Sequence, residues 1–270
     1  MMARVYVPKD TTACALGADA VAAAIEAEAK ARDLDITVVR NGSRGMFWME
    51  PFVEIDSERG RLGFSSVSTS DVQALFDTGF PNTGDSPLCV GLVEDIPYFR
   101  DQQRVNFARA GIIDPLDIED YQSLGGYRGL TRALSLSSQE IVDEIKASGL
   151  RGRGGAAFPA GIKWQTVLDT PAEQKYIVCN ADEGDSGTFA DRLLMEADPF
   201  QLIEGMTIAG LATGADRGYI YLRSEYPRAA EVLNRALAVA REAGVLGDDL
   251  LGSGLAFDIE LRIGAGAYIC

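Results

Sequence analysis

From residue 175 onward, strand-like and helix-like segments alternate along the chain, and this alternation limits the fold more than any other feature. Pro199 and Pro227 each stand where a helix begins and tolerates proline. The expected strands are residues 176–179, 219–222 and 257–263, and the expected helices are residues 198–212 and 227–244. Strands joined by helical crossovers form a mostly parallel sheet. We therefore expect an α/β fold whose ligands bind outside the carboxyl ends of the strands.

Residues 1–80 predict a separate and smaller α/β domain. Their apolar pattern indicates three strands and two helices in the order β-α-β-β-α. The strands are residues 4–7, 36–39 and 52–55, and the helices are residues 18–31 and 71–76. This order is typical of a thioredoxin-like domain. Residues 81–103 begin with a dense run of turn formers, PNTGDSP, which predicts a linker before a second domain over residues 104–270.

The charge balance and the absence of histidine exclude several functions. The 270 residues include 25 Lys and Arg against 40 Asp and Glu, a formal net charge of −15, and no histidine. Such an acidic protein binds nucleic acid and anionic membranes poorly, so neither is expected as a partner. Without imidazole there is no Ser-His or Cys-His nucleophile pair, no imidazole general base and no histidine metal ligand.

Cysteine usage points to a reducing compartment. The four cysteines are Cys14, Cys89, Cys179 and Cys270. They form no C-x2-C pair, so we expect neither a zinc site nor a complete iron–sulfur cluster within this chain. Sparse cysteines fit a cytoplasmic protein. No apolar stretch approaches the ~18 residues of a membrane helix, and MMARVYVPKD lacks the apolar region of a secretory signal.

A glycine-rich run with basic residues, SGLRGRGGAAFPAGIKW over residues 148–164, is the first candidate site. A helix is predicted before it, because Ser137 and Glu140 form a capping box. Glycine lets the backbone approach a ligand and its amides surround an anion, while Arg153 and Lys163 add positive charge. A phosphate-bearing ligand explains this pattern best, although a mobile basic surface loop would also fit it.

Two familiar nucleotide motifs are rejected for this run, although Gly152-x-Gly154-x-x-Ala157 formally matches the dinucleotide fingerprint. The segment Gly161-Ile162-Lys163-Trp164 lacks the Ser or Thr that follows Lys in a Walker A loop. A helix rather than a strand precedes the glycines, which is not the context of the dinucleotide fingerprint. Phe158 could stack on a nucleotide ring or fill the core, and for Trp164 the core is the favoured interpretation.

An acidic cluster at the end of the strand over residues 176–179 is the second candidate site. It contains Asn180, Asp182, Glu183 and Asp185. Three carboxylates this close repel one another unless something organises them. They could accept hydrogen bonds from a ligand, chelate a metal or form a solvated turn before a helix, but the residue types do not match an EF-hand loop.

Four motifs in a fixed order resemble a known family. They are SGLRGRGGAAFPAGIKW, CNADEGDSGTFADR, DPFQLIEGMTIAG and GAGAYIC. Together they are similar to the FMN- and NADH-binding flavoprotein subunit of respiratory complex I, and to diaphorase subunits of NAD-reducing hydrogenases and NAD-dependent formate dehydrogenases. The likeness extends over residues 104–270. It implies a flavoprotein subunit that passes electrons between FMN and NAD+/NADH by hydride transfer, with the cofactors carrying the chemistry.

The resemblance also implies the residues of the cofactor site, and it implies no catalytic side chain. Residues expected to line FMN are Gly152, Arg153, Gly154, Gly155, Lys163, Asn180, Asp182 and Glu183. Phe158 and Asp185 are expected to meet NADH, and Tyr268 is expected to lie near the flavin. We expect the carboxylate of Glu183 to lower the flavin potential, and Lys163 to neutralise phosphate or the reduced flavin.

The first 80 residues resemble the thioredoxin-like half of the 2Fe-2S subunit that accompanies this flavoprotein. Cysteines would be expected at two positions held here by Arg40 and Arg44, and Cys14 alone cannot hold a cluster. A fused thioredoxin-like domain without ligands is most similar to diaphorase subunits of molybdenum formate dehydrogenases. The implied partners are a molybdenum-containing catalytic subunit and a small 2Fe-2S subunit.

Family members continue beyond the position of Cys270 with further FMN contacts and the cysteines of a 4Fe-4S cluster. We therefore expect this sequence to be part of a longer protein, with any 4Fe-4S cluster beyond residue 270. Two other functions remain open: the diaphorase subunit of an NAD-reducing hydrogenase or complex I-like enzyme, and a non-catalytic scaffold subunit. The intact glycine-rich run and acidic cluster argue against the scaffold.

Overall fold

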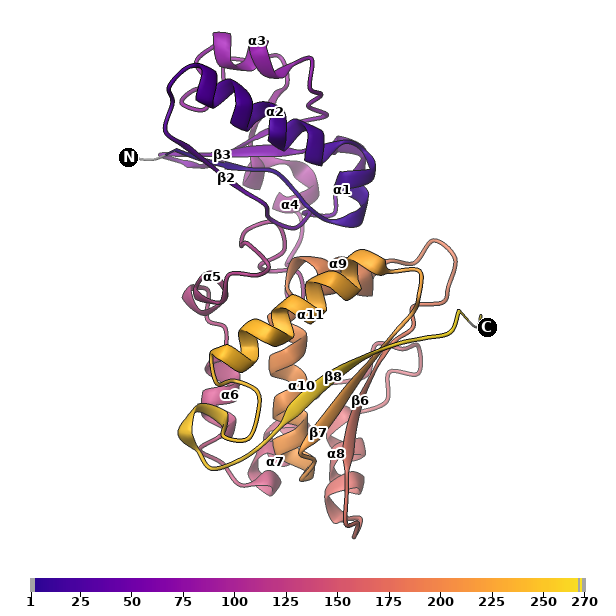
Figure 1. Cartoon of the computed structure of the whole chain (residues 1–270). Helices are drawn as coiled ribbons and strands as arrows, with labels where there is room; N and C mark the ends of the chain where they lie inside the picture. Colours follow the sequence, from indigo (N-terminus) through magenta and orange to yellow (C-terminus); the bar gives the residue numbers. More distant parts are fainter. Residues whose placement is uncertain (1–2, 267, 269–270) are drawn as a thin grey trace. The chain divides into compact units, whose positions relative to one another are not determined.

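The computed structural model describes residues 3–266 and 268. The chain forms two compact units, Met1–Pro115 with Glu196–Asp198, and Leu116–Met195 with Pro199–Cys270. Each unit combines helices with its own β-sheet (Figure 1). We call them unit 1 and unit 2 and describe each by itself.

Unit 1 contains a five-stranded sheet in the order β2-β1-β3-β4-β5. Its strands are β1 (Ala3–Tyr6), β2 (Ile36–Val39), β3 (Val53–Ser57), β4 (Gly60–Phe64) and β5 (Cys89–Leu92). β1 and β2 run parallel, which requires the helical crossover between them, and the remaining neighbours are antiparallel. The described helices of unit 1 are α1 (Thr11–Ala15), α2 (Ala18–Ala31), α3 (Val72–Asp77) and α4 (Pro97–Arg100), with short 3-10 turns η1 (Phe47–Met49) and η2 (Val93–Asp95).

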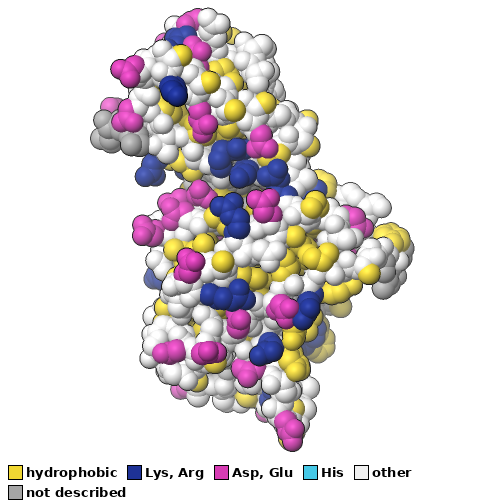
Figure 2. All heavy atoms as spheres, viewed as in Figure 1, with side chains coloured by type: hydrophobic (Ala, Val, Ile, Leu, Met, Phe, Trp, Pro, Cys, Tyr) yellow, Lys and Arg dark blue, Asp and Glu magenta, His cyan; other side chains and the backbone are white. Residues whose placement is uncertain are grey.

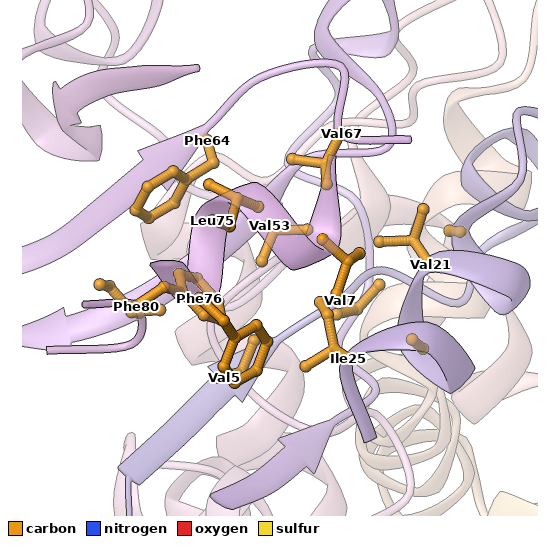
Figure 3. Close-up of a cluster of buried hydrophobic side chains, with 14 of the residues drawn as sticks. Val5, Val7, Val21, Ile25, Val53, Phe64, Val67, Leu75, Phe76 and Phe80 are labelled. Atoms are coloured by element: carbon orange, nitrogen blue, oxygen red, sulfur yellow. The ribbon is translucent and has the colours of Figure 1, made fainter. Parts of the chain in front are cut away.

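The core of unit 1 lies between α2, α3 and the sheet. Val21 and Ile25 of α2 are spaced one helical turn apart and both face the strands (Figure 3). They meet side chains such as Val5 and Val53, while Phe76 of α3 contacts Phe80 edge to face at 5.3 Å. The apolar pattern read from the sequence thus forms a continuous buried layer.

Each of the five segments predicted in residues 1–80 forms the expected helix or strand, but the prediction missed α1 and β4 in this range and β5 beyond it. β4 contains Gly60 and Gly63, which weaken a strand signal. Gly63 is needed for packing, since a Cβ there would lie 2.3 Å from the ring of Phe52. β5 lies within residues 81–103, which were predicted to be a linker. Its short run CVGL forms a strand because it pairs with β4, despite the turn formers before it. The predicted domain boundaries themselves stay a prediction.

Unit 2 is built on a three-stranded, entirely parallel sheet in the order β6-β7-β8, which confirms the predicted α/β class. Its strands are β6 (Tyr176–Ala181), β7 (Arg217–Leu222) and β8 (Asp258–Ile263). The helices are α5 (Ile118–Ser123), α6 (Arg128–Ala133), α7 (Ser138–Ser148), α8 (Ala160–Asp169), α9 (Ala190–Ala197), α10 (Pro199–Thr213) and α11 (Pro227–Glu242), with the 3-10 turn η3 (Leu250–Gly252). The end of α9, from Glu196 on, belongs to unit 1.

One face of this sheet is packed and the other is exposed. α10 packs against β6 and β7, and α11 packs against β8 (Figure 1). Glycine allows the close approach of α10, because a Cβ on Gly210 would lie 2.5 Å from the ring of Phe257. On the opposite face Tyr176, Val178 and Tyr221 are exposed, and Figure 2 shows hydrophobic atoms at the surface of unit 2. The packed face fixes the strand ends that carry the candidate site.

Candidate functional site

The glycine-rich run forms a loop that is closed at its base. α7 carries the predicted capping box of Ser137 and Glu140 and ends at Gly149, whose φ of 69° suits a glycine C-cap. Gly152 N–H donates to the carbonyl of Phe158 at 2.9 Å, and Ala160 N–H donates to the carbonyl of Leu150 at 2.8 Å. The loop over residues 152–158 is thus held between α7 and α8 and presents its backbone at the surface.

The glycines of this loop differ in what requires them. A Cβ on Gly161 would lie 2.8 Å from the backbone nitrogen of Lys146, so Gly161 is needed for α8 to pack against α7. A Cβ on Gly154 or Gly155 would meet nothing within 4 Å. Packing within the protein therefore explains neither glycine. The backbone of Gly155 has a φ of 100°, a conformation that favours glycine. Gly154 has no such requirement, and close approach of a ligand to the backbone would explain it.

A cavity of about 320 Å³ lies beside this loop. Its lining residues are Gly152, Gly154, Ala156, Ala157, Phe158, Ala160, Lys163 and Trp164. The ring of Phe158 is 48% exposed. Trp164 is half-buried and also packs on the apolar cluster around Val142, so it serves the core and the cavity at once.

The sequence-predicted residues of the loop are therefore partly brought together. Gly152, Gly154, Phe158 and Lys163 share the cavity, while Arg153 and Gly155 belong to the loop without lining it. The small residues Ala156, Ala157 and Ala160 were missed, because alanine carries no chemical signal of its own. Their small side chains leave room beside the loop.

The acidic cluster forms a turn between β6 and α9, which we call the acidic turn (residues 180–189). Asp182 N–H donates to Oδ1 of Asn180 at 3.0 Å, and Thr188 N–H donates to the carbonyl of Asp185 at 3.1 Å. Asp185 is exposed and Asp182 is half-buried. The cavity lining contains no residue of the acidic turn, so a single pocket formed by both segments stays a prediction.

Glu183 has a structural role within the acidic turn. Its side chain is buried, and its Oε1 accepts the N–H of Asp191 at 3.0 Å while Oε2 accepts the N–H of Arg192 at 3.2 Å. These amides open α9, where a carboxylate satisfies unpaired donors and interacts favourably with the helix dipole. Oε2 also accepts the hydroxyl of Tyr226 at 3.0 Å. The carboxylate of Glu183 therefore links the acidic turn to α9 and to the end of β7.

Burial and charge shift the pKa values of groups around this link. Burial, followed by the hydrogen bond to Glu183, raises the pKa of Tyr226. Burial, followed by the charge of Glu183, raises the pKa of Asp191. Burial also raises the pKa of the Cys179 thiol on β6 to about 11, so this thiol is protonated at neutral pH and is a poor nucleophile.

The carboxyl end of β7 adjoins the acidic turn, because β7 pairs in parallel with β6. Arg223, directly after β7, donates to the carbonyl of Glu183, and Tyr226 follows three residues later. Neither was identified from the sequence, although the rule that pointed to the end of β6 applies equally to its parallel neighbour. Tyr268 lies beyond β8 and is 62% exposed.

Arg40 and Arg44, which stand where cluster-binding cysteines would be expected, both form ion pairs within unit 1. Asp19 accepts from Arg40 at 2.7 Å and lies 3.3 Å from the sulfur of Cys14. Arg44 forms a buried, two-pronged pair with Glu54 at 2.7 and 2.8 Å. A guanidinium group has no lone pair to offer a metal, so neither Arg40 nor Arg44 can replace a cysteine as a cluster ligand.

Comparison with known proteins finds one matching family and several relatives. Residues 145–270 match the family described as Complex1_51K, Nuo51 FMN-binding domain. The chain is 53% identical over 169 residues to the NADP-reducing hydrogenase subunit HndC of Solidesulfovibrio fructosivorans, covering 63% of this chain and 34% of that protein. It is 41% identical over 175 residues to the mitochondrial NADH-ubiquinone oxidoreductase 51 kDa subunit of Neurospora crassa, covering 63% of this chain and 35% of that protein.

A third relative is the NAD-reducing hydrogenase HoxS subunit alpha of Cupriavidus necator, 46% identical over 142 residues, which are 52% of this chain and 24% of that protein. The chain spans about a third of the length of the first two of these relatives. A crystal structure of an NAD+-reducing [NiFe]-hydrogenase aligns with 99% of this chain and 44% of its own, at 23% identity and a TM-score of 0.46. Within the part of the chain that the structure describes, no helix is long and apolar enough to cross a membrane.

Proposed function

On the premise that these matches support the complex I flavoprotein family for residues 145–270, we propose that the protein is a diaphorase subunit. It exchanges electrons between FMN and NAD+/NADH. The observation that carries this proposal is the open glycine loop: Gly154 and Gly155 face no protein atom within 4 Å, beside a cavity that Lys163 lines.

The residues present fit an FMN phosphate and ring. The uncrowded backbone of residues 152–155 would accept a phosphate or ring edge, and Lys163 would supply the positive charge. The exposed ring of Phe158 would stack on the dinucleotide, and Asp185 would hold its ribose or amide group. Bound FMN would accept the hydride. This chain would bind and align the two cofactors, which is consistent with a site that has no histidine and no activated thiol.

The other predicted contacts belong to the same proposal. Asn180, Asp182 and Tyr268 would complete the flavin pocket from the carboxyl ends of β6 and β8. For Glu183 the proposal is narrower, because its carboxylate already accepts two backbone amides and a hydroxyl. Its charge could still lower the flavin potential without direct contact.

FMN binding and NADH-dependent dye reduction test this function. The full-length protein, including any residues beyond 270, is purified and titrated with FMN, followed by flavin fluorescence, and then assayed with NADH and an artificial electron acceptor. We expect one FMN per chain and dye reduction that depends on added FMN. A protein that binds no FMN at micromolar concentration, while keeping its folded structure by circular dichroism, would contradict the proposal.

The finer proposal concerns the complex. We propose a cytoplasmic NAD-dependent formate dehydrogenase in which a molybdenum-containing subunit and a small 2Fe-2S subunit deliver electrons, with unit 1 as a docking scaffold. The paired Arg40 and Arg44 of unit 1 support the scaffold role, since these positions hold no cluster. Any 4Fe-4S cluster would lie beyond residue 270.

A hydrogenase is the second candidate, because the names of two relatives specify hydrogenase subunits. Metal analysis of the native complex separates the two. Molybdenum with formate-dependent NAD+ reduction supports the formate dehydrogenase, whereas nickel with hydrogen-dependent reduction contradicts it.

A further inference from the structure

Tyr226 lies at the base of the acidic turn. It stands directly before α11, and its side chain is 7% exposed. Its hydroxyl lies 3.0 Å from Oε2 of Glu183 and 3.3 Å from the carbonyl oxygen of Thr188. One hydroxyl group therefore contacts both ends of the segment 183–188, which contains Asp185.

The tip of this segment is exposed, and at Asp185 the carbonyl accepts a hydrogen bond from the N–H of Thr188 at 3.1 Å. Asp185, Ser186 and Gly187 are all exposed, and Gly187 has a φ of 80° that suits glycine. A loop whose tip makes few buried contacts is ordered mainly by the interactions at its base. The direction in which Asp185 points therefore depends on the contacts of residues 183 and 188.

The ring of Tyr226 is held independently of its hydroxyl. The guanidinium groups of Arg223 and Arg192 lie 5.0 and 5.6 Å from its centroid, in the range of cation–π contact. A phenylalanine at this position would keep the ring and both guanidinium neighbours. Tyr226→Phe therefore removes the hydroxyl and its hydrogen bonds while keeping the contacts of the ring.

We propose that Tyr226 is a positioning residue for the dinucleotide: through Glu183 and Thr188 it holds the acidic turn so that Asp185 meets NADH. This inference rests on the proposed function and deepens it. It assigns a role to a residue that touches neither cofactor. The charged Glu183 makes the contact strong, because hydrogen bonds to ionised acceptors exceed those between neutral groups.

Steady-state kinetics with Tyr226→Phe tests this role. We expect the KM for NADH to rise about tenfold, equivalent to about 1.4 kcal/mol, with kcat changed less than about twofold. The matched control is Tyr176→Phe, which removes a hydroxyl from an exposed tyrosine of the same sheet and should leave both constants unchanged. Thermal unfolding of both variants checks that they are folded.

The double variant Tyr226→Phe with Glu183→Gln shows whether Tyr226 acts through Glu183. If it does, the two changes are not additive, and the second adds little to the KM of the first. Equal KM values for the wild type and Tyr226→Phe, or a fall in kcat alone, overturn the positioning role and leave the diaphorase function standing. A wild-type protein without FMN and dye reduction overturns the function and the inference together.

Discussion

The glycine loop and the acidic turn are both short loops beside the sheet of unit 2, but they differ in how their backbones are used. In the glycine loop, Gly154 and Gly155 face open space, and backbone hydrogen bonds hold the loop at its base. In the acidic turn, the Glu183 side chain is buried and accepts three hydrogen bonds. The first loop leaves room for a ligand, and the second holds the structure that a ligand would meet. Glycine-rich and acid-rich sequences thus look equally functional, but the first presents open backbone while the second buries one of its carboxylates, that of Glu183.

The largest expected effect on stability comes from removing the buried carboxylate of the acidic turn. Glu183→Ala leaves two amides of α9 without their acceptor and removes the nearer of the two acceptors of the Tyr226 hydroxyl, so we expect the free energy of unfolding to fall by roughly 3 kcal/mol. Chemical denaturation measures it. Asp185→Ala, at an exposed position of the same turn, should change stability by less than about 0.5 kcal/mol. Equal, small losses of unfolding free energy in both variants would contradict the structural role of Glu183 and indicate that both carboxylates are solvated.

The next effect tests the two kinds of glycine in and beside the glycine loop. Gly161→Ala places a methyl group against the backbone of Lys146, and we expect a loss of about 2 kcal/mol of stability. Gly154→Ala meets no neighbour and should alter stability by no more than about 0.5 kcal/mol, while weakening FMN binding. A stable Gly161→Ala protein would show that the packing of α8 on α7 can relax.

A charge removal tests the open side directly. Lys163→Ala should weaken FMN binding about tenfold, because a charge-assisted contact to phosphate is worth about 1.4 kcal/mol or more. Its thermal midpoint should not move, since Lys163 is exposed. Lys30→Ala on α2 of unit 1 is the matched control, and fluorescence titration compares the two. An unchanged FMN affinity in Lys163→Ala would mean that the cavity lined by Lys163 does not bind the FMN phosphate.

The smallest effect extends the comparison to Glu50, a buried carboxylate of unit 1. Burial raises the pKa of Glu50 from 4.5 to about 8, although Ser43 and Phe52 donate hydrogen bonds to it. Between about pH 4.5 and about pH 8 the folded state therefore binds more protons than the unfolded state, and the free energy of unfolding falls as the pH rises through this range. We expect a fall of about 1 kcal/mol between about pH 6 and about pH 7. Glu50→Gln should remove that slope, and an unchanged slope would assign it to other groups.

Much of the fold follows from local pattern, and the exceptions have physical reasons. The helix over residues 18–31 and the strand over residues 36–39 were predicted at the observed bounds, because their apolar spacing and flanking residues agree. β4 and β5 were missed because glycines and turn formers outweigh a short strand signal. Those strands form because neighbouring strands supply their hydrogen-bond partners, which no local window contains.

The sequence alone was enough to predict the alternating α/β order, the parallel sheet of unit 2, the position of the glycine loop and the family likeness, since each depends on spacing along the chain. Only the tertiary structure decided that Gly161 serves packing while Gly154 faces open space, and that Glu183 points at α9 and Tyr226. Those outcomes depend on contacts between residues that are between 8 and 43 positions apart in the chain. A side chain's chemistry sets what it can bind, but its neighbours in space determine which of those partners it meets.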